Sequence, residues 1–204
     1  MRTETLVVGP LAVNCYLLDD GDGRVLVIDP GAEAQRIRRA LGPRTVAGIL
    51  LTHGHFDHIG AVDDLGPAPL MIHAADAAML GDPLRNGSGL VPGLGAVKAR
   101  PADRLLAGGE EIPFGNEVLT VVHLPGHTAG SAGFLLGERL FAGDTLFHRS
   151  IGRTDLPGGD GAAILDSIRG RLWPLADGVV VLPGHGPPTT IGEERRLNPF
   201  CAGA

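Results

Sequence analysis

The sequence predicts an α/β fold, and two observations support this. Short runs of apolar and β-branched residues recur along the whole chain, and segments with apolar residues at helical spacing lie between them. The chain has 204 residues, enough for one domain that buries about 70% of its unfolded surface, and neither a repeat nor a change of composition divides it. We therefore expect a single domain over residues 1–204.

Eight short runs predict strands, because Val, Ile and Leu dominate them and turn-forming residues bound them. In chain order they are 5–8, 13–18, 25–28, 46–51, 70–72, 118–122, 134–136 and 179–182. Helices are expected at 32–41, 74–80, 161–172 and 191–197. The last helix begins with a capping box, in which the Thr190 hydroxyl and the Glu193 carboxylate accept backbone N–H groups. The Gly-rich segment 80–100 predicts a long loop of the kind that often forms a substrate wall.

Composition and charge exclude several classes of partner. Seventeen Lys and Arg against 23 Asp and Glu argue against a surface for duplex nucleic acid. No apolar run approaches the roughly 18 residues of a membrane span. The two cysteines, Cys15 and Cys201, are too few for a disulfide framework, and the N-terminus lacks the pattern of a signal peptide. We expect a cytoplasmic protein with neither nucleic-acid nor membrane partners, and with Cys15 buried in a strand.

One short segment carries the strongest chemical signal. Four side chains that commonly bind metals, His53, His55, Asp57 and His58, lie within six residues. Random placement of the eight histidines and the aspartates would give this spacing about once in a thousand such chains. A single ion cannot use all four, because neighbouring residues cannot all point at one centre about 2 Å away. The motif therefore predicts two metal ions.

Other residues must then complete two coordination spheres. His127, Asp144 and His185 each follow a short apolar run and stand beside Gly or Pro. This setting predicts a tight loop at a strand end, where a rigid sheet can hold a metal ligand in position. We expect all three residues to join the cluster.

Six sequence runs together resemble a known family, and they extend from about residue 5 to residue 200. They are 52–60 (THGHFDHIG), 125–128 (PGHT), 143–147 (GDTLF), 152–159 (GRTDLPGG), 182–186 (LPGHG) and 194–200 (ERRLNPF). They resemble the metallo-β-lactamase superfamily and, within it, the glyoxalase II-like hydrolases. The runs 152–159 and 194–200 are similar to the short, single-domain bacterial branch of that group.

The resemblance implies an αββα sandwich with two metals at one edge, between the sheets. It also implies an assignment of ligands: His53, His55 and His127 on one ion, and Asp57, His58 and His185 on the other. Asp144 would bridge them, because two cations about 3.5–4 Å apart need an anion between them. His and Asp ligands accommodate two divalent ions, with zinc expected and iron or manganese as alternatives.

The implied reaction is hydrolysis of a small acyl thioester such as S-lactoylglutathione. A hydroxide bridging the two ions would be the nucleophile, because metal binding lowers the pKa of water from about 15.7 to about 7. Asp57 would orient this hydroxide and accept its proton. An alternative is a mononuclear iron enzyme, because persulfide dioxygenases also resemble this chain, including a Gly-Arg-Thr-Asp run like residues 152–155.

Substrate contacts are less constrained by the sequence. Arg153 is a candidate to clamp a substrate carboxylate, and the competing interpretation is an ion pair with Asp155 that shapes the loop. His148 is a candidate to line the mouth of the site. His123 could donate a hydrogen bond to a metal ligand or simply end a strand, and His73 is expected to begin a helix in solvent.

Overall fold

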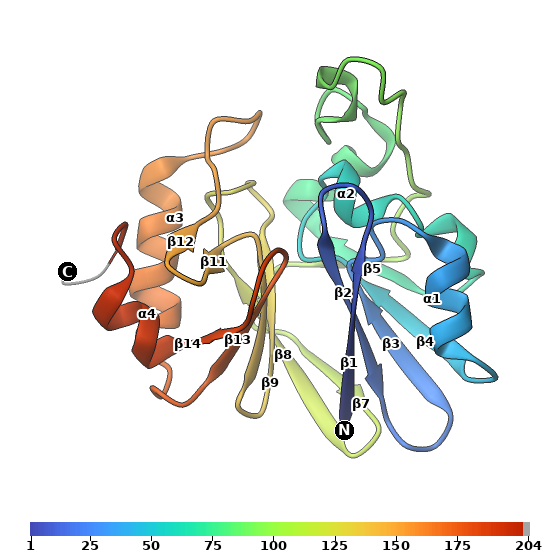
Figure 1. Ribbon diagram of the computed structural model, residues 1–204, viewed down its shortest axis with the longest axis horizontal. Coiled ribbons are helices and arrows are strands. Elements are labelled where there is room, and N and C mark those ends of the chain that lie inside the picture. The colour runs from blue at the N-terminus through green and yellow to red at the C-terminus, as the bar shows by residue number, and fades with distance from the viewer. Residues whose placement is uncertain (202–204) are drawn as a thin grey trace.

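The computed structural model describes residues 1–201 as two six-stranded sheets packed face to face, with helices on their outer sides (Figure 1). This is the four-layer αββα arrangement. Residues 202–204 of the expected domain lie outside the described part.

The first sheet uses the N-terminal half of the chain, and its strands follow one another in sequence order. They are β1 (Arg2–Val8), β2 (Val13–Asp19), β3 (Arg24–Ile28), β4 (Thr45–Leu50), β5 (Leu70–His73) and β6 (Arg104–Leu106). The first three are antiparallel, and β3 to β6 run parallel. The helical segments between them are α1 (Ala34–Leu41), α2 (Phe56–Ile59), η1 (Asp63–Leu65), η2 (Ala74–Gly81) and η3 (Ser88–Leu90).

The second sheet has the order β14-β13-β10-β9-β8-β7 and contains one parallel pair, β10 with β13. Its strands are β7 (Glu111–Phe114), β8 (Glu117–His123), β9 (Ala132–Leu136), β10 (Arg139–Gly143), β13 (Val180–Pro183) and β14 (Thr189–Thr190). A small hairpin of β11 (Leu146–Phe147) and β12 (Ser150–Ile151) follows β10. The helices of this half are α3 (Gly161–Ser167), the π-helical η4 (Ile168–Leu172) and α4 (Ile191–Leu197).

Alternation along β2 shows how the sequence builds these layers. Cys15 and Leu17 belong to the core beneath α1, whereas Tyr16 and Leu18 belong to the core between the sheets, because successive side chains of a strand point to opposite faces. Phe141 contributes to the central core from the second sheet. A third core lies between that sheet and α3, η4 and α4, and it contains Cys201.

The eight predicted strands are confirmed. The described residues add six that the sequence did not predict, β6, β7, β10, β11, β12 and β14, each with five residues or fewer. The helices at 161–172 and 191–197 are confirmed, whereas 74–80 forms a 3₁₀ rather than an α-helix. Thr190 caps α4 as expected by accepting the Glu193 N–H at 3.2 Å. The Glu193 carboxylate, however, accepts from Arg149 at 2.8 Å.

Segment 80–100 is mostly a loop, as predicted, but it includes the last two residues of η2 and the 3₁₀ turn η3. It is anchored by the buried Asn86, whose amide donates to the carbonyls of Met79 (3.1 Å) and Val97 (2.9 Å). The side-chain oxygen of Asn86 accepts hydrogen bonds from the backbone N–H and the hydroxyl of Ser88. Every helix in residues 1–201 is too short or too polar to serve as a membrane span.

Candidate metal centre

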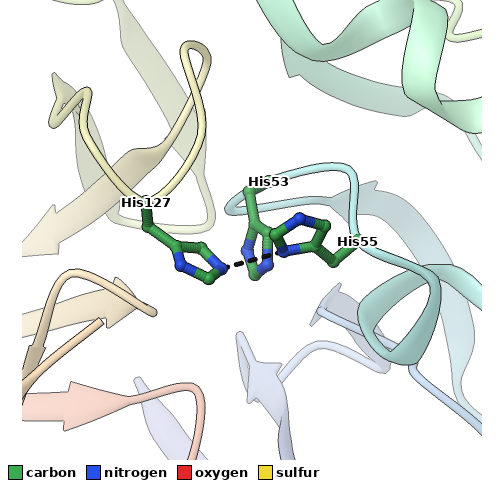
Figure 2. Close-up of side chains that lie close together, drawn as sticks. All are labelled: His53, His55 and His127. Atoms are coloured by element: carbon green, nitrogen blue, oxygen red, sulfur yellow. Dashed lines mark hydrogen bonds between the residues drawn. The ribbon is translucent and has the colours of Figure 1, made fainter. Parts of the chain in front are cut away.

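The seven side chains expected to bind metal meet at one edge of the sandwich, in four segments that each follow a strand. The segments follow β4 (His53 and His55 in a loop, Asp57 and His58 in the short helix α2), β8 (His127), β10 (Asp144) and β13 (His185). Because β4 belongs to the first sheet and the other three strands to the second, both halves of the sandwich contribute. Figure 2 shows His127 approaching His53 and His55 from the facing loop.

The donor atoms gather into overlapping groups, each within 4.8 Å: His53 with His55 and His127, His53 with His58 and Asp144, and Asp57 with His58 and His185. In the first group, His55 Nδ1 lies 2.8 Å from His127 Nε2. In the third, His185 Nε2 lies 3.4 Å from both Asp57 Oδ2 and His58 Nε2. The first and third groups have no residue in common, so the cluster could hold two ions, at two centres.

Asp144 lies between these two centres. Its Oδ2 is 3.6 Å from His127 Nε2 and 3.4 Å from His185 Nε2. Its Oδ1 is 3.6 Å from His58 Nε2. A carboxylate in this position can contact two cations at once.

Four histidines use Nδ1 to bond to an oxygen, so in the neutral ring Nδ1 carries the proton and Nε2 does not. The pairs are His53 with Thr52 Oγ1 (3.1 Å), His58 with Asp29 Oδ2 (2.9 Å), His127 with the Arg153 carbonyl (2.7 Å) and His185 with the Leu11 carbonyl (2.9 Å). The Nε2 lone pairs are then available to a metal ion.

Three buried atoms of the cluster have no hydrogen-bond partner within residues 1–201: His53 Nε2, His55 Nε2 and Asp144 Oδ1. Buried polar atoms are rarely left in this state, because an unmade hydrogen bond there costs roughly 1–3 kcal/mol. A nitrogen lone pair on His53 and a carboxylate oxygen on Asp144 both suit a cation. The donor set therefore fits divalent metal ions.

The two centres differ in protonation. Burial lowers the pKa of His53 well below its usual value and that of His55 to about 3, so both are neutral at pH 7. Burial also disfavours the charged form of His58, but Asp57, Asp144 and Asp29 outweigh it and raise the pKa to about 9. For His185, burial is likewise outweighed, because its ring donates hydrogen bonds to Asp144 and Asp57 and their charges raise the pKa to about 10. Without metal, the second centre therefore carries protons.

Two glycines make the close approach of the loops possible. A Cβ built on Gly184 would overlap Asp144 Oδ1 and the His58 ring. One built on Gly152 would overlap the carbonyl of Asp144. Only glycine leaves room for the loops at these points.

Two buried aspartates escaped the sequence analysis. Asp29 accepts from the backbone N–H of Thr52 (2.8 Å), from its hydroxyl (2.6 Å) and from His58. Asp29 directly follows a predicted strand and precedes Pro30 and Gly31, the setting used to find the ligands, so a signal was present. The second aspartate, Asp76, lies within a predicted helix, and the sequence around it carries no signal of a role in the site.

Asp76 joins the two loops that carry the first centre. It accepts from the Gly54 N–H (3.1 Å), the Thr128 hydroxyl (2.6 Å) and the Gly130 N–H (2.7 Å). Gly54 stands between His53 and His55, and Thr128 follows His127. One buried carboxylate therefore fixes the spacing of these three histidines.

A cavity of about 680 Å³ opens over the cluster. Its floor includes His55, Asp57, His127, Asp144 and His185, and its walls include the apolar side chains of Leu11, Phe56, Leu90, Val91, Phe147 and Leu156. The 80–100 loop thus forms part of the cavity wall through Leu90 and Val91.

Arg153 lines this cavity and also forms a two-pronged ion pair with Asp155, at 2.7 and 2.8 Å. Both interpretations of Arg153 are therefore compatible with its position. His148 is absent from the described lining of the cavity, and its Nε2 lies 3.6 Å from Glu193. Its expected contact with substrate stays a prediction.

Of the remaining histidines, His73 differs from expectation, whereas His123 ends β8, one of its two expected roles. His73 is 7% exposed rather than solvated, because it ends β5 and stacks on His123 with ring centroids 4.0 Å apart. His123 bonds through Nε2 to the Ala129 carbonyl at 3.0 Å rather than to a metal-binding side chain. It therefore ties the strand end to the loop that carries His127.

Comparison with known proteins gives a consistent result. The family model of the metallo-beta-lactamase superfamily matches residues 8–185. The probable metallo-hydrolase YqgX of Bacillus subtilis is 39% identical over 100% of this chain and 99% of its own length. Hydroxyacylglutathione hydrolase GloC of Haemophilus influenzae is 36% identical over 98% of each chain.

Three solved structures share the fold over nearly all of this chain. BLEG-1 B3 metallo-beta-lactamase has a TM-score of 0.93 and 41% identity, over 99% of this chain and 100% of its own. TTHA1623 in a di-iron-bound form has a TM-score of 0.82 and 36% identity, over 97% and 99%. ETHE1 from Myxococcus xanthus has a TM-score of 0.78 and 30% identity, over 100% and 85%.

Proposed function

The chain belongs to the metallo-β-lactamase superfamily, and from its site we propose that it is a binuclear hydrolase of small acyl thioesters such as S-lactoylglutathione. Its relatives and its His/Asp cluster support a metal-dependent hydrolase. The observation that carries the binuclear assignment is the position of the Asp144 carboxylate, which lies within 3.6 Å of His127 from one group and of His58 and His185 from the other.

The proposed ligands divide between the two centres, with His53, His55 and His127 at one and Asp57, His58 and His185 at the other, and Asp144 shared. When bound, the ions supply Lewis acidity, which lowers the pKa of water toward neutrality and polarises an acyl oxygen. Zinc is the proposed metal, with iron or manganese as alternatives, and TTHA1623 offers a di-iron precedent.

The chain's own residues would orient and activate the reactants. Asp57 lies on the cavity floor with a pKa held below its usual range, because His58 and His185 outweigh the effect of burial. Its carboxylate is therefore ionised at pH 7 and can hold a water molecule by accepting a hydrogen bond, and can take up its proton during attack. The apolar walls limit access of other water to the reacting carbon.

A thioester suits this site better than an amide, since its acyl carbon is more reactive toward a water-derived nucleophile. The similarity to GloC, a hydroxyacylglutathione hydrolase, supports the same substrate class. Arg153 at the cavity wall would bind a carboxylate of the thiol half. We propose that the enzyme acts in the cytoplasm on a small molecule, without nucleic-acid or membrane partners.

The alternative is a mononuclear iron enzyme like the persulfide dioxygenases, whose motifs, including a Gly-Arg-Thr-Asp run like residues 152–155, also resemble this chain. Asp57, His58 and His185 form a group that could hold a second ion, so the number of bound ions distinguishes the two enzymes. Elemental analysis of protein purified from cells tests this point. Two ions per chain are expected, whereas a single iron would support the alternative.

The activity test gives metal-loaded protein S-lactoylglutathione, a β-lactam and, with an oxygen electrode, glutathione persulfide. We expect thioester cleavage with little turnover of the β-lactam, although BLEG-1 is a metallo-beta-lactamase by name. Oxygen uptake without thioester cleavage, or faster turnover of the β-lactam, would refute the proposed function.

Arg153→Ala tests the carboxylate contact. KM for S-lactoylglutathione should rise with a modest effect on kcat, because binding common to substrate and transition state is lost. Arg85→Ala is a matched control, since Arg85 also pairs with an aspartate, Asp82 at 3.3 Å, on an exposed loop. An equal KM for Arg153→Ala and wild type would exclude the contact.

A further inference from the structure

A second, smaller cavity of about 270 Å³ adjoins the catalytic cavity and shares Leu11, Phe56 and Asp57 with it. It lies between the turn that joins β1 to β2, helix α2 and the far end of the 80–100 loop. Its other apolar lining includes Val8, Pro10, Val13, Ala32, Leu94 and Val97. We call this cavity the annex.

The annex differs from the catalytic cavity in charge. Among the described residues that line it, the charged side chains are Glu33 and Asp57, both acidic. Glu33 is already engaged, accepting from the Gly9 N–H at 2.9 Å and from Arg36 at 3.1 Å. The cationic Arg153 belongs to the lining of the catalytic cavity instead. A carboxylate is therefore disfavoured in the annex, and an apolar group is favoured.

Leu11 forms the wall between the two cavities and is held by the backbone. It lies in a turn where Gly9 and Ala12 have φ values of 69° and 56°, closed by a hydrogen bond from Ala12 N to Gly9 O at 3.1 Å. Its carbonyl accepts from His185 Nδ1 at 2.9 Å, so the wall is fastened to the second centre. Its side chain is nevertheless 50% exposed, which leaves an apolar surface open to a ligand.

The opposite wall is also apolar and fixed in place. Leu94 is 38% exposed, and the carbonyl of Val97 accepts from the buried Asn86 amide at 2.9 Å. The annex is thus bounded by anchored backbone on both sides and borders the catalytic cavity at Leu11, Phe56 and Asp57. Such a preformed apolar cavity binds an apolar chain without a large ordering cost.

We propose that the annex is an acyl-chain subsite, so that the preferred substrates are thioesters of apolar acyl chains with a carboxylate-bearing thiol. This inference rests on the proposed thioesterase function and specifies its substrate class. The thiol half lies in the catalytic cavity near Arg153, and the acyl chain passes Leu11 into the annex. The volume of about 270 Å³ equals that of about nine groups the size of a water molecule, which limits the chain to about nine carbons.

A series of S-acylglutathiones from acetyl to dodecanoyl tests this proposal. Each added methylene should raise kcat/KM by up to about fourfold, because burying one methylene group stabilises the bound state by about 0.8 kcal/mol. This increase in kcat/KM should stop at acyl chains of about nine carbons. Binding of the matching thioethers, which cannot be hydrolysed, is measured by calorimetry with metal-loaded and metal-free protein. Their dissociation constants should fall along the series in both forms.

Two variants test whether the acyl chain of the substrate lies in the annex. Leu94→Glu places a charge in the annex, so kcat/KM should no longer increase with acyl-chain length. Val97→Phe reduces the volume of the annex, so the increase in kcat/KM should stop at shorter acyl chains. Leu84→Glu is the matched control on the same loop, because Leu84 is 63% exposed and lines neither cavity; it should leave the series unchanged. Circular dichroism checks that each variant is folded.

The outcomes separate the two proposals. Cleavage of every thioester with equal efficiency overturns the subsite and leaves the thioesterase function standing. Failure to cleave any thioester overturns the proposed function. In that case the dissociation constants of the thioethers still test whether the annex binds an apolar chain. A chain-length dependence that persists unchanged in both Leu94→Glu and Val97→Phe would place the acyl chain elsewhere and refute the subsite.

Discussion

Asp29 follows strand β3 and hydrogen-bonds to His58 of the candidate metal centre. The substitution Asp29→Asn tests how much this buried negative charge contributes to metal binding. The carboxylate is 1% exposed and accepts hydrogen bonds from Thr52 and His58. Its backbone has a φ of 51°, a conformation that Asn tolerates better than most residues. Asp29→Asn therefore keeps size and backbone and removes the negative charge.

The expected effect follows from the hydrogen bond to His58 Nδ1. Loss of the carboxylate weakens control of the His58 tautomer and lowers the basicity of Nε2. Removal of such a supporting partner typically costs 10- to 100-fold in metal affinity, or about 1.4–2.7 kcal/mol. Asp29→Ala would instead leave three buried donors unpaired, at roughly 1–3 kcal/mol each, and would confound affinity with unfolding.

The assay is a competition titration with a chromogenic zinc chelator, combined with thermal unfolding. We expect the ion near His58 to bind 10- to 100-fold more weakly, as worked out above, and the ion near His53 to be less affected, because Asp29 reaches His53 only through Thr52. Asp103→Asn is the control, since Asp103 accepts the Leu70 N–H at 2.8 Å away from the site. Unchanged affinities in Asp29→Asn, or equal losses in both variants, would refute the reasoning.

Three further predictions concern the ligands. Asp144→Asn should lose one ion and most activity while remaining folded, so elemental analysis that still finds two ions would contradict the bridging role. His185→Ala should weaken the ion shared with Asp57 and His58, whereas unchanged metal content would indicate a mononuclear site. The raised pKa values of His58 (about 9) and His185 (about 10) mean that metal must displace their protons at pH 7. Apparent affinity should therefore rise with pH toward 9, and calorimetry in buffers of different ionisation enthalpy should detect about two protons released at pH 7 and fewer at pH 9.

The sequence predicted the metal-binding cluster better than its supports. His53 to His58 share one short segment, so their spacing alone carried the signal. Asp29 acts on His58 across 29 positions, a relation that exists only because β3 and β4 pair in parallel. No local pattern encodes such a contact.

The short strands and His73 illustrate a second limit. β10 has the sequence Arg-Leu-Phe-Ala-Gly, which is too brief and too rich in small residues to be distinguished from a loop, although it carries Asp144 at its end. His73 is polar and begins a helical segment, which predicts exposure. Its burial arises from the stack with His123, a residue of the other sheet.

The chain passes from the first sheet to the second only once in the described residues, between Leu106 and Glu111. Four of the seven metal-binding side chains precede this crossing, and the last, His185, is followed by only 19 of the 204 residues. A domain folds as a unit, and the core between the sheets contains residues from both sides of this crossing, such as Leu18 and Phe141. The cluster is therefore assembled only when the two halves of the chain pack together, so a substitution that weakens the packing between the sheets should also weaken metal binding.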